Sequence, residues 1–126
     1  MNKQIINTSK APSPIGPYSQ AVKASGMLYI SGQIAFNPAT SELITATIRE
    51  EAEQVMNNLK AILESAELDF TNVIKTTIFL SDMNLFADVN EVYGKFFDTN
   101  YPARETVAVK TLPKNVNVEI SMIASE

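Results

Sequence analysis

The residues of this chain that could carry out chemistry are few in kind. The sequence has no histidine and no cysteine, and lysine and arginine together number 10 of its 126 residues. Without histidine the chain lacks the commonest general base and the Ser-His nucleophile pair. Without cysteine it lacks thiolate nucleophiles, disulfides and the usual ligands of structural zinc. Any reaction must therefore depend on carboxylates, hydroxyls, Lys, Arg, backbone amides and water.

Arg104 and Glu119 are the first candidates. Arg104 follows Tyr-Pro-Ala in "YPARET", and its planar guanidinium suits a carboxylate or a phosphate. Glu119 lies among aliphatic residues of a strand-like segment, where desolvation would raise its pKa and suit it to proton transfer. Spacing alone favours a simpler interpretation, in which the two residues pair with each other or face water.

Three further positions have a polar or glycine residue where structure or chemistry could need it. Tyr18 follows a rigid Gly-Pro, although packing of its ring on a sheet is the simpler interpretation. Gly32 interrupts a strand-like run in "SGQ", which indicates a bulge or a close backbone approach. Asn90 falls on the apolar stripe of a helical pattern, so we expect it to be partly buried and hydrogen-bonded. No P-loop, G-x-G-x-x-G, G-x-S-x-G or calcium-loop motif occurs. Residue spacing alone therefore indicates no more than a possible anion site.

The periodicity of the chain predicts the elements that position these residues. Residues 47–66 have the spacing of an amphipathic helix, and Thr47 with Glu50 matches a capping box. A second helix is expected over residues 84–97. Strands are predicted at 4–8, on both sides of the turn Ser25-Gly26, and at 72–80, 105–112 and 116–123. The order β-β-β-α-β-α-β-β predicts an α+β fold, with one mixed sheet, two helices on one face and a single domain over residues 1–126.

The sheet face without helices predicts association between subunits. In the last strand the aliphatic residues point one way, whereas Asn117, Glu119, Ser121 and Ile123 point the other, so that the second face is mixed. The net charge of −4 and the scattered basic residues argue against nucleic acid as a partner. No signal peptide and no apolar stretch of membrane-spanning length occurs, so we expect a cytoplasmic protein without a membrane partner.

Four segments together resemble the RidA (reactive intermediate deaminase A) family, which is also described as YjgF-type or endoribonuclease L-PSP-type. They are "APSPIGPYSQAV", "LYISGQIAFNPAT", "VIKTTIFLSDMNLFADVNEVYGKFF" and "YPARETVAVKTLPKNVNVEISMIA". The resemblance implies a chorismate-mutase-like fold and a homotrimer with active sites between subunits. It also implies hydrolysis of 2-imino acids, such as 2-iminobutanoate and 2-iminopropanoate, to 2-keto acids and ammonia. A protonated imine is already electrophilic, so neither a metal nor another cofactor is expected.

The same resemblance assigns roles to particular residues. It implies that Arg104 holds the substrate carboxylate and that Glu119 activates or orients water. The remaining residues that match the family's site are Tyr18 and Ser31 as catalytic residues, and Gly32, Asn90 and the backbone amide of Thr106 as substrate-binding groups.

One departure from the family pattern follows Arg104. Many RidA proteins continue Pro-Ala-Arg with Ser-Cys, whereas this chain has Glu105 and Thr106. Because neighbours in an extended segment alternate, we expect Glu105 to point away from Arg104, with substrate preference the property most open to change. Two alternative functions stay open at this point. One is a non-catalytic small-carboxylate-binding module, and the other is the ribonuclease or translation inhibition attached to parts of the family.

Overall fold

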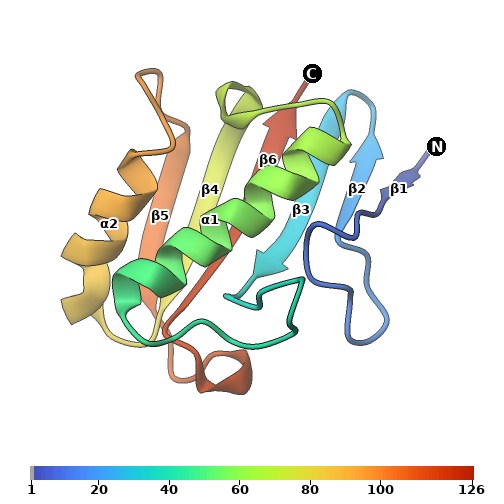
Figure 1. The fold of residues 1–126 in the computed structure, drawn as a ribbon. Coiled ribbons are helices and arrows are strands. Elements are labelled where there is room, and N and C mark those ends of the chain that lie inside the picture. The colour runs from blue at the N-terminus through green and yellow to red at the C-terminus, as the bar shows by residue number, and fades with distance from the viewer. Residues whose placement is uncertain (1) are drawn as a thin grey trace.

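The computed structural model describes residues 2–126 and contains one six-stranded sheet with two helices (Figure 1). The order of strands across the sheet is β1-β2-β3-β6-β4-β5. The strands are β1 (Gln4–Ile6), β2 (Ala21–Ala24), β3 (Met27–Gln33), β4 (Val73–Leu80), β5 (Ala103–Ala108) and β6 (Val118–Ser125). The helices are α1 (Ile48–Ser65) and α2 (Phe86–Gly94), with short 3-10 turns η1 (Phe70–Asn72), η2 (Met83–Leu85) and η3 (Pro113–Asn115). The predicted order of elements and the α+β class are confirmed.

Local sequence accounts for the main boundaries. Ser25 and Gly26 both have positive φ (52° and 77°), as the tight turn between β2 and β3 requires. The side chain of Thr47 caps α1 by accepting a hydrogen bond from the backbone N–H of Glu50 at 3.1 Å. The second helix is shorter than expected and ends at Gly94, a residue that favours helix termination.

The sheet is mixed because β4 lies between the last two strands of the chain. It pairs antiparallel with β6 and parallel with β5, so that β5 and β6 are consecutive in sequence without being neighbours. The pairing of β3 with β6 shifts register between Ile30 and Gln33, so the strand is irregular at Gly32, where a bulge or a close approach was expected.

The two faces of the sheet differ in what covers them. Both helices lie on one face, and alternate residues of β6 on that face, Val118 to Ala124, are buried (Figure 1). The other face has no helix and is called the open face below. Register places Ile5, Val22, Tyr29 and Ile123 in one row across it, and Ile5 and Tyr29 are 50% and 49% exposed. An apolar row of this kind is the surface feature expected of a subunit interface.

None of the helices in residues 2–126 has the length and apolar character needed to cross a membrane.

Candidate active site

The predicted site residues form two clusters that lie in different parts of the structure. The first surrounds Arg104 on β5, beside α2. The second surrounds Glu119 on β6, beside the bulge of β3 and the proline-rich loop of residues 7–19.

The guanidinium of Arg104 is held against α2 by a hydrogen bond and by aromatic rings. Its Nη1 donates to Asn90 Oδ1 at 2.7 Å, and its Cζ lies 5.2 Å from the ring centre of Tyr93 and 5.6 Å from that of Phe86. The hydroxyl of Tyr93 donates to the buried Thr76 at 2.9 Å, which fixes this ring in place. Burial raises the pKa of the Tyr93 hydroxyl, so the ring stays neutral beside the cation.

The guanidinium of Arg104 is still able to bind an anion. Within residues 2–126, no carboxylate lies within 4.0 Å of its guanidinium, whereas Arg49 bonds both Asp88 and Glu91. The hollow beside Arg104 is also lined by Tyr101, which is 63% exposed. The cluster is therefore a pre-positioned arginine fork at the edge of the sheet.

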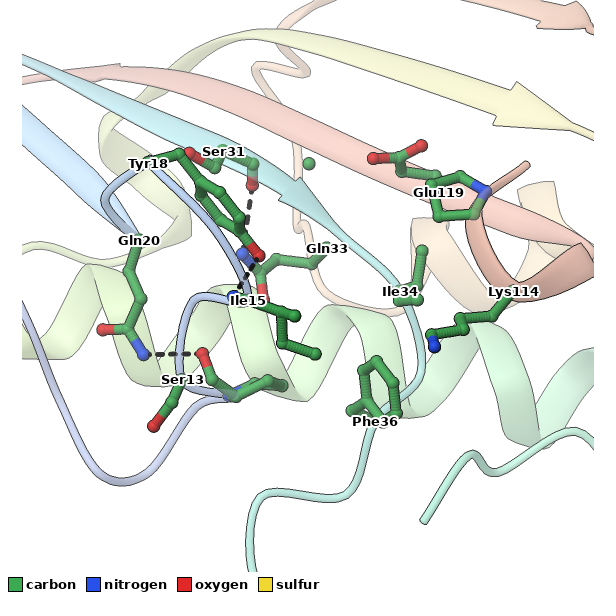
Figure 2. A pocket seen from close by; sticks show the side chains of 13 residues that line it. Ser13, Ile15, Tyr18, Gln20, Ser31, Gln33, Ile34, Phe36, Lys114 and Glu119 are labelled. Carbon is green, nitrogen blue, oxygen red and sulfur yellow. Dashed lines mark hydrogen bonds between the residues drawn. The ribbon is translucent and has the colours of Figure 1, made fainter. Parts of the chain in front are cut away.

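Glu119 lies in a pocket of about 510 Å³ on the other side of the molecule. Figure 2 shows Tyr18 and Ser31 along one wall and Glu119 opposite, with Ile34 and Phe36 nearby. Tyr18 is 51% exposed, and its hydroxyl accepts from the backbone N–H of Ile15 at 3.2 Å, so its own proton remains free to donate. The Ser31 hydroxyl donates to the carbonyl of Ser19 at 2.6 Å and can still accept.

The carboxyl group of Glu119 is desolvated. Burial raises its pKa above the ordinary value of 4.5, in the direction predicted from its place among aliphatic residues. In the described part of the chain, no lysine or arginine lies within 4.0 Å of it. A half-buried carboxyl without a cation is a suitable acceptor for a proton from water.

A glycine is needed at position 32 because the carboxyl group of Glu119 occupies the space that a side chain would fill. A Cβ atom built on Gly32 would stand 2.9 Å from Glu119 Cδ, closer than side-chain carbons approach one another. Any larger residue would displace the carboxyl group. The glycine therefore gives Glu119 its place in the pocket.

The two clusters open on opposite faces of the sheet. Arg104 is in register with Thr76 of β4, which faces the helices, whereas Glu119 is in register with Phe79. Positions 76 and 79 have opposite parity in the strand, so the two side chains project to opposite sides. The interpretation that Arg104 pairs with Glu119 is therefore wrong. One protomer does not bring the two residues into one cavity.

Three other expectations can be compared with the structure. Asn90 is exposed rather than partly buried, because α2 turns this residue toward Arg104 at the edge of the sheet. Glu105 points away from Arg104, as predicted, and pairs with Lys75 at 2.9 Å. Thr106 lies on the helix side like Arg104, and its buried Oγ1 has no hydrogen-bond partner within residues 2–126. It lines neither hollow.

Sequence reasoning missed some residues that shape the clusters. Tyr93 lies in the apolar pattern of α2, which predicts core packing, yet its ring supports Arg104. Lys114, with a positive φ of 58°, lines the pocket of Glu119 from η3. Pro113 beside Lys114 is typical of a turn, but no sequence pattern places that turn at the pocket.

Comparison with known proteins shows the family to which the chain belongs. The family described as Endoribonuclease L-PSP matches residues 8–126. A RutC family protein of Pyrococcus horikoshii is 50% identical over 97% of this chain and 97% of its own length. The human 2-iminobutanoate/2-iminopropanoate deaminase is 47% identical over 97% of this chain and 89% of its own. The structure of E. coli TdcF with bound serine superposes with a TM-score of 0.94 and 44% identity, covering 98% of both chains. This chain therefore belongs to the endoribonuclease L-PSP family, the YjgF/RidA family, and has its chorismate-mutase-like fold.

Proposed function

We propose that this protein hydrolyses reactive 2-imino acids, such as 2-iminobutanoate and 2-iminopropanoate, to 2-keto acids and ammonia. Several relatives at about 47% identity carry the name of this activity, which supports a hydrolase role for the family member described here. A related structure contains bound serine, a small amino acid with the carboxylate that an imino acid shares.

The observation that carries the proposal is the state of Glu119. Its carboxyl group is desolvated, has no cation within ion-pair distance in the described residues, and lies in a pocket with the hydroxyls of Tyr18 and Ser31. Burial without a compensating charge costs stability, and functional sites are where such costs are commonly found.

The chemistry needs only the groups present. Water adds to the carbon of the protonated imine while the Glu119 carboxylate accepts a proton from that water. The resulting carbinolamine collapses to the 2-keto acid: its nitrogen, protonated by Glu119, leaves as ammonia, and its hydroxyl gives its proton back to the Glu119 carboxylate, which passes it to the departing ammonia as ammonium. The Tyr18 hydroxyl is placed to donate a hydrogen bond to substrate, and Ser31 and Gly32 form the wall beside the reacting carbon.

Arg104 is proposed to bind the substrate carboxylate, with Asn90 holding the guanidinium. Because Arg104 and Glu119 open on opposite faces of one chain, a complete site needs Arg104 from a neighbouring copy. We propose a homotrimer in which each site lies between two subunits, and in which the Thr106 backbone also contacts substrate. The exposed apolar row of the open face, with Val107 at 46% exposure on the same face, supports association there.

A direct assay tests the proposal. An amino acid oxidase generates 2-iminopropanoate in place, and disappearance of the imine is followed with and without the purified protein. Arg104→Ala should lower kcat/KM by about a hundredfold, because a charge-assisted contact to the carboxylate is lost. Arg49→Ala is the matched control, since this arginine pairs with Asp88 and Glu91 on the surface and should leave the rate unchanged.

Two outcomes would count against an imine hydrolase. If the wild-type protein leaves the imine to decay at the buffer rate, the proposal fails. If ligands such as 2-ketobutanoate raise the Tm in an Arg104-dependent way without turnover, the protein is a binding module instead.

The family name also mentions an endoribonuclease, but the surface of residues 2–126 does not favour that activity. Three of the scattered basic side chains, Lys23, Lys75 and Arg49, are engaged by carboxylates. The net charge is −4. Polyanion binding normally requires a basic surface, so we do not propose RNA as the substrate.

A further inference from the structure

The core of this protein contains a small set of buried polar side chains, and three of them bind segments around the Glu119 pocket. They are Gln20, Gln33, Glu51, Asn58 and Thr76, among a much larger number of buried apolar residues. A buried polar group is costly unless it is hydrogen-bonded, so each such residue indicates a requirement that an apolar side chain would not meet. Gln20, Glu51 and Asn58 each hydrogen-bond a segment without regular structure and hold it in place.

Gln20 fastens the proline-rich loop. It is 2% exposed, and its Nε2 donates to the carbonyls of Thr8 (3.0 Å), Ala11 (3.3 Å) and Pro12 (2.8 Å). Its Oε1 accepts from the backbone N–H of Thr8 at 2.8 Å. The loop between β1 and β2 supplies one wall of the Glu119 pocket, and Figure 2 shows Gln20 reaching back toward it beside Ser13.

Asn58 fastens the segment after β3. It projects from α1, is 1% exposed, and its Nδ2 donates to the carbonyls of Ile34 (3.2 Å) and Phe36 (2.9 Å). Its Oδ1 is occupied by Gln54 of the same helix at 2.9 Å. Ile34 and Phe36 are the apolar wall of the same pocket.

Glu51 fastens the segment between η3 and β6. It is fully buried on α1, and its Oε2 accepts from the backbone N–H groups of Asn117 (2.7 Å) and Val118 (3.2 Å). Its Oε1 accepts from Asn117 Nδ2 at 2.9 Å. The segment held in this way leads from Lys114 to Glu119, both of which line the pocket.

We propose that Gln20, Glu51 and Asn58 are positioning residues of the proposed active site, each holding one irregular wall of the pocket at a fixed distance from Glu119. Three separate segments are involved, and each anchor makes at least one hydrogen bond to a residue that lines this pocket or is next to one that does. Glu51 and Asn58 are two helical turns apart on one face of α1, so that the helix acts as a common support for two of the walls. The inference rests on the proposed function for its kinetic readout.

Apolar replacements of similar volume test the role. Gln20→Met, Glu51→Met and Asn58→Leu keep the core filled but remove the anchoring bonds. Each should lower kcat/KM for 2-iminopropanoate about ten- to a hundredfold, because a displacement of about 1 Å in the wall is enough for such a loss. Val55→Ala is the matched control: Val55 is fully buried on α1 between the two anchors, and its truncation lowers the Tm without removing an anchor.

Glu51→Gln separates geometry from charge. Glutamine retains an oxygen that accepts from both backbone N–H groups, so this variant should keep most of the wild-type kcat, whereas Glu51→Met should not. If an apolar variant fails to fold, Gln20→Asn, Glu51→Asp and Asn58→Ser replace it, since they remain polar but are too short to reach the same carbonyls and amides.

Hydrogen exchange provides a readout that does not depend on turnover. Each apolar variant should increase exchange in its own segment (residues 8–18, 34–37 or 113–118) and leave the other two segments protected, whereas Val55→Ala should spare all three. Unchanged exchange in the anchored segments, or losses of kcat/KM no larger than those of Val55→Ala at equal Tm, would overturn the inference. A wild-type protein that is inactive but shows the expected exchange pattern would instead remove the proposed function and leave the anchors in place.

Discussion

Burial of the charged Glu119 carboxylate in the pocket costs folding free energy. Its carboxyl group is half-buried, lies across Gly32, and has only desolvation acting on its pKa. A residue chosen for stability alone would not ionise at this position.

Glu119→Gln should therefore stabilise the folded protein at neutral pH. Because burial raises the pKa of Glu119 in the folded state, the folded protein keeps this proton to a higher pH than the unfolded chain. The stability contributed by the proton is present below the ordinary pKa of 4.5 and is lost as pH rises through the raised folded-state pKa. Glutamine cannot ionise and avoids that loss.

The measurement is the Tm of both proteins from about pH 4 to about pH 8. The advantage of the variant should grow with pH and vanish at the acid end, while imine hydrolysis is abolished throughout. A Tm difference that does not change with pH would show that Glu119 is not desolvated in the assembled protein.

At the same scale, the sequence offered candidate site residues but could not predict how far apart they lie. Spacing named Arg104 and Glu119 as candidates, and in the described residues neither side chain forms an ion pair. Their positions on opposite faces depend on the register of β4 against β5 and β6, which sequence spacing within either strand does not determine.

At the scale of elements, the β4–β5 pair contains Glu105, which differs from the serine that many RidA proteins have after Pro-Ala-Arg. This residue is one position along from Arg104, so its side chain lies on the open face, where it meets Lys75 of β4 at 2.9 Å. Both side chains are partly exposed in one protomer, and such a pair contributes less than about 1 kcal/mol. We expect Glu105 to neutralise Lys75 on a surface that is proposed to be an interface.

Charge reversal at this pair tests that role. Glu105→Lys would place two ammonium groups on adjacent strands of the open face, and should lower the free energy of unfolding by about 1 kcal/mol and weaken assembly. The double variant Lys75→Glu with Glu105→Lys restores opposite charges and should recover most of the loss. Chemical denaturation and light scattering at decreasing protein concentration measure the two effects. Equal stability and assembly in all three proteins would mean that the pair is only a surface contact.

The elements themselves were largely predictable, whereas the segments between them were not. The 3.6-residue period and Thr47 cap of α1, and the Ser25-Gly26 turn, are local signals that the structure confirms. The pocket walls at residues 8–18, 34–36 and 113–117 have no period. Their positions depend on hydrogen bonds to side chains distant in sequence, such as Gln20, Glu51 and Asn58, which only the fold brings together.

For the whole molecule, the central feature is that each chain carries Arg104 on one side of its sheet and the Glu119 pocket on the other. Each chain therefore supplies one part of each of two proposed sites. A cyclic assembly can join the Arg104 edge of one copy to the Glu119 pocket of the next, and a head-to-tail interface of this kind closes into a ring. A site contained within one protomer would not need any such arrangement.

Mixing two inactive variants distinguishes these possibilities. Arg104→Ala retains the Glu119 pocket and Glu119→Gln retains the arginine, so an interface with Arg104 from one variant and Glu119 from the other is intact. In trimers assembled at random from equal amounts, about one quarter of the sites should be of this kind, and about one quarter of the wild-type rate should return. The proteins are co-expressed or refolded together, and each variant refolded alone provides the background rate. No recovery in mixed assemblies that light scattering shows to be trimers would contradict a site shared between Arg104 of one copy and Glu119 of the next.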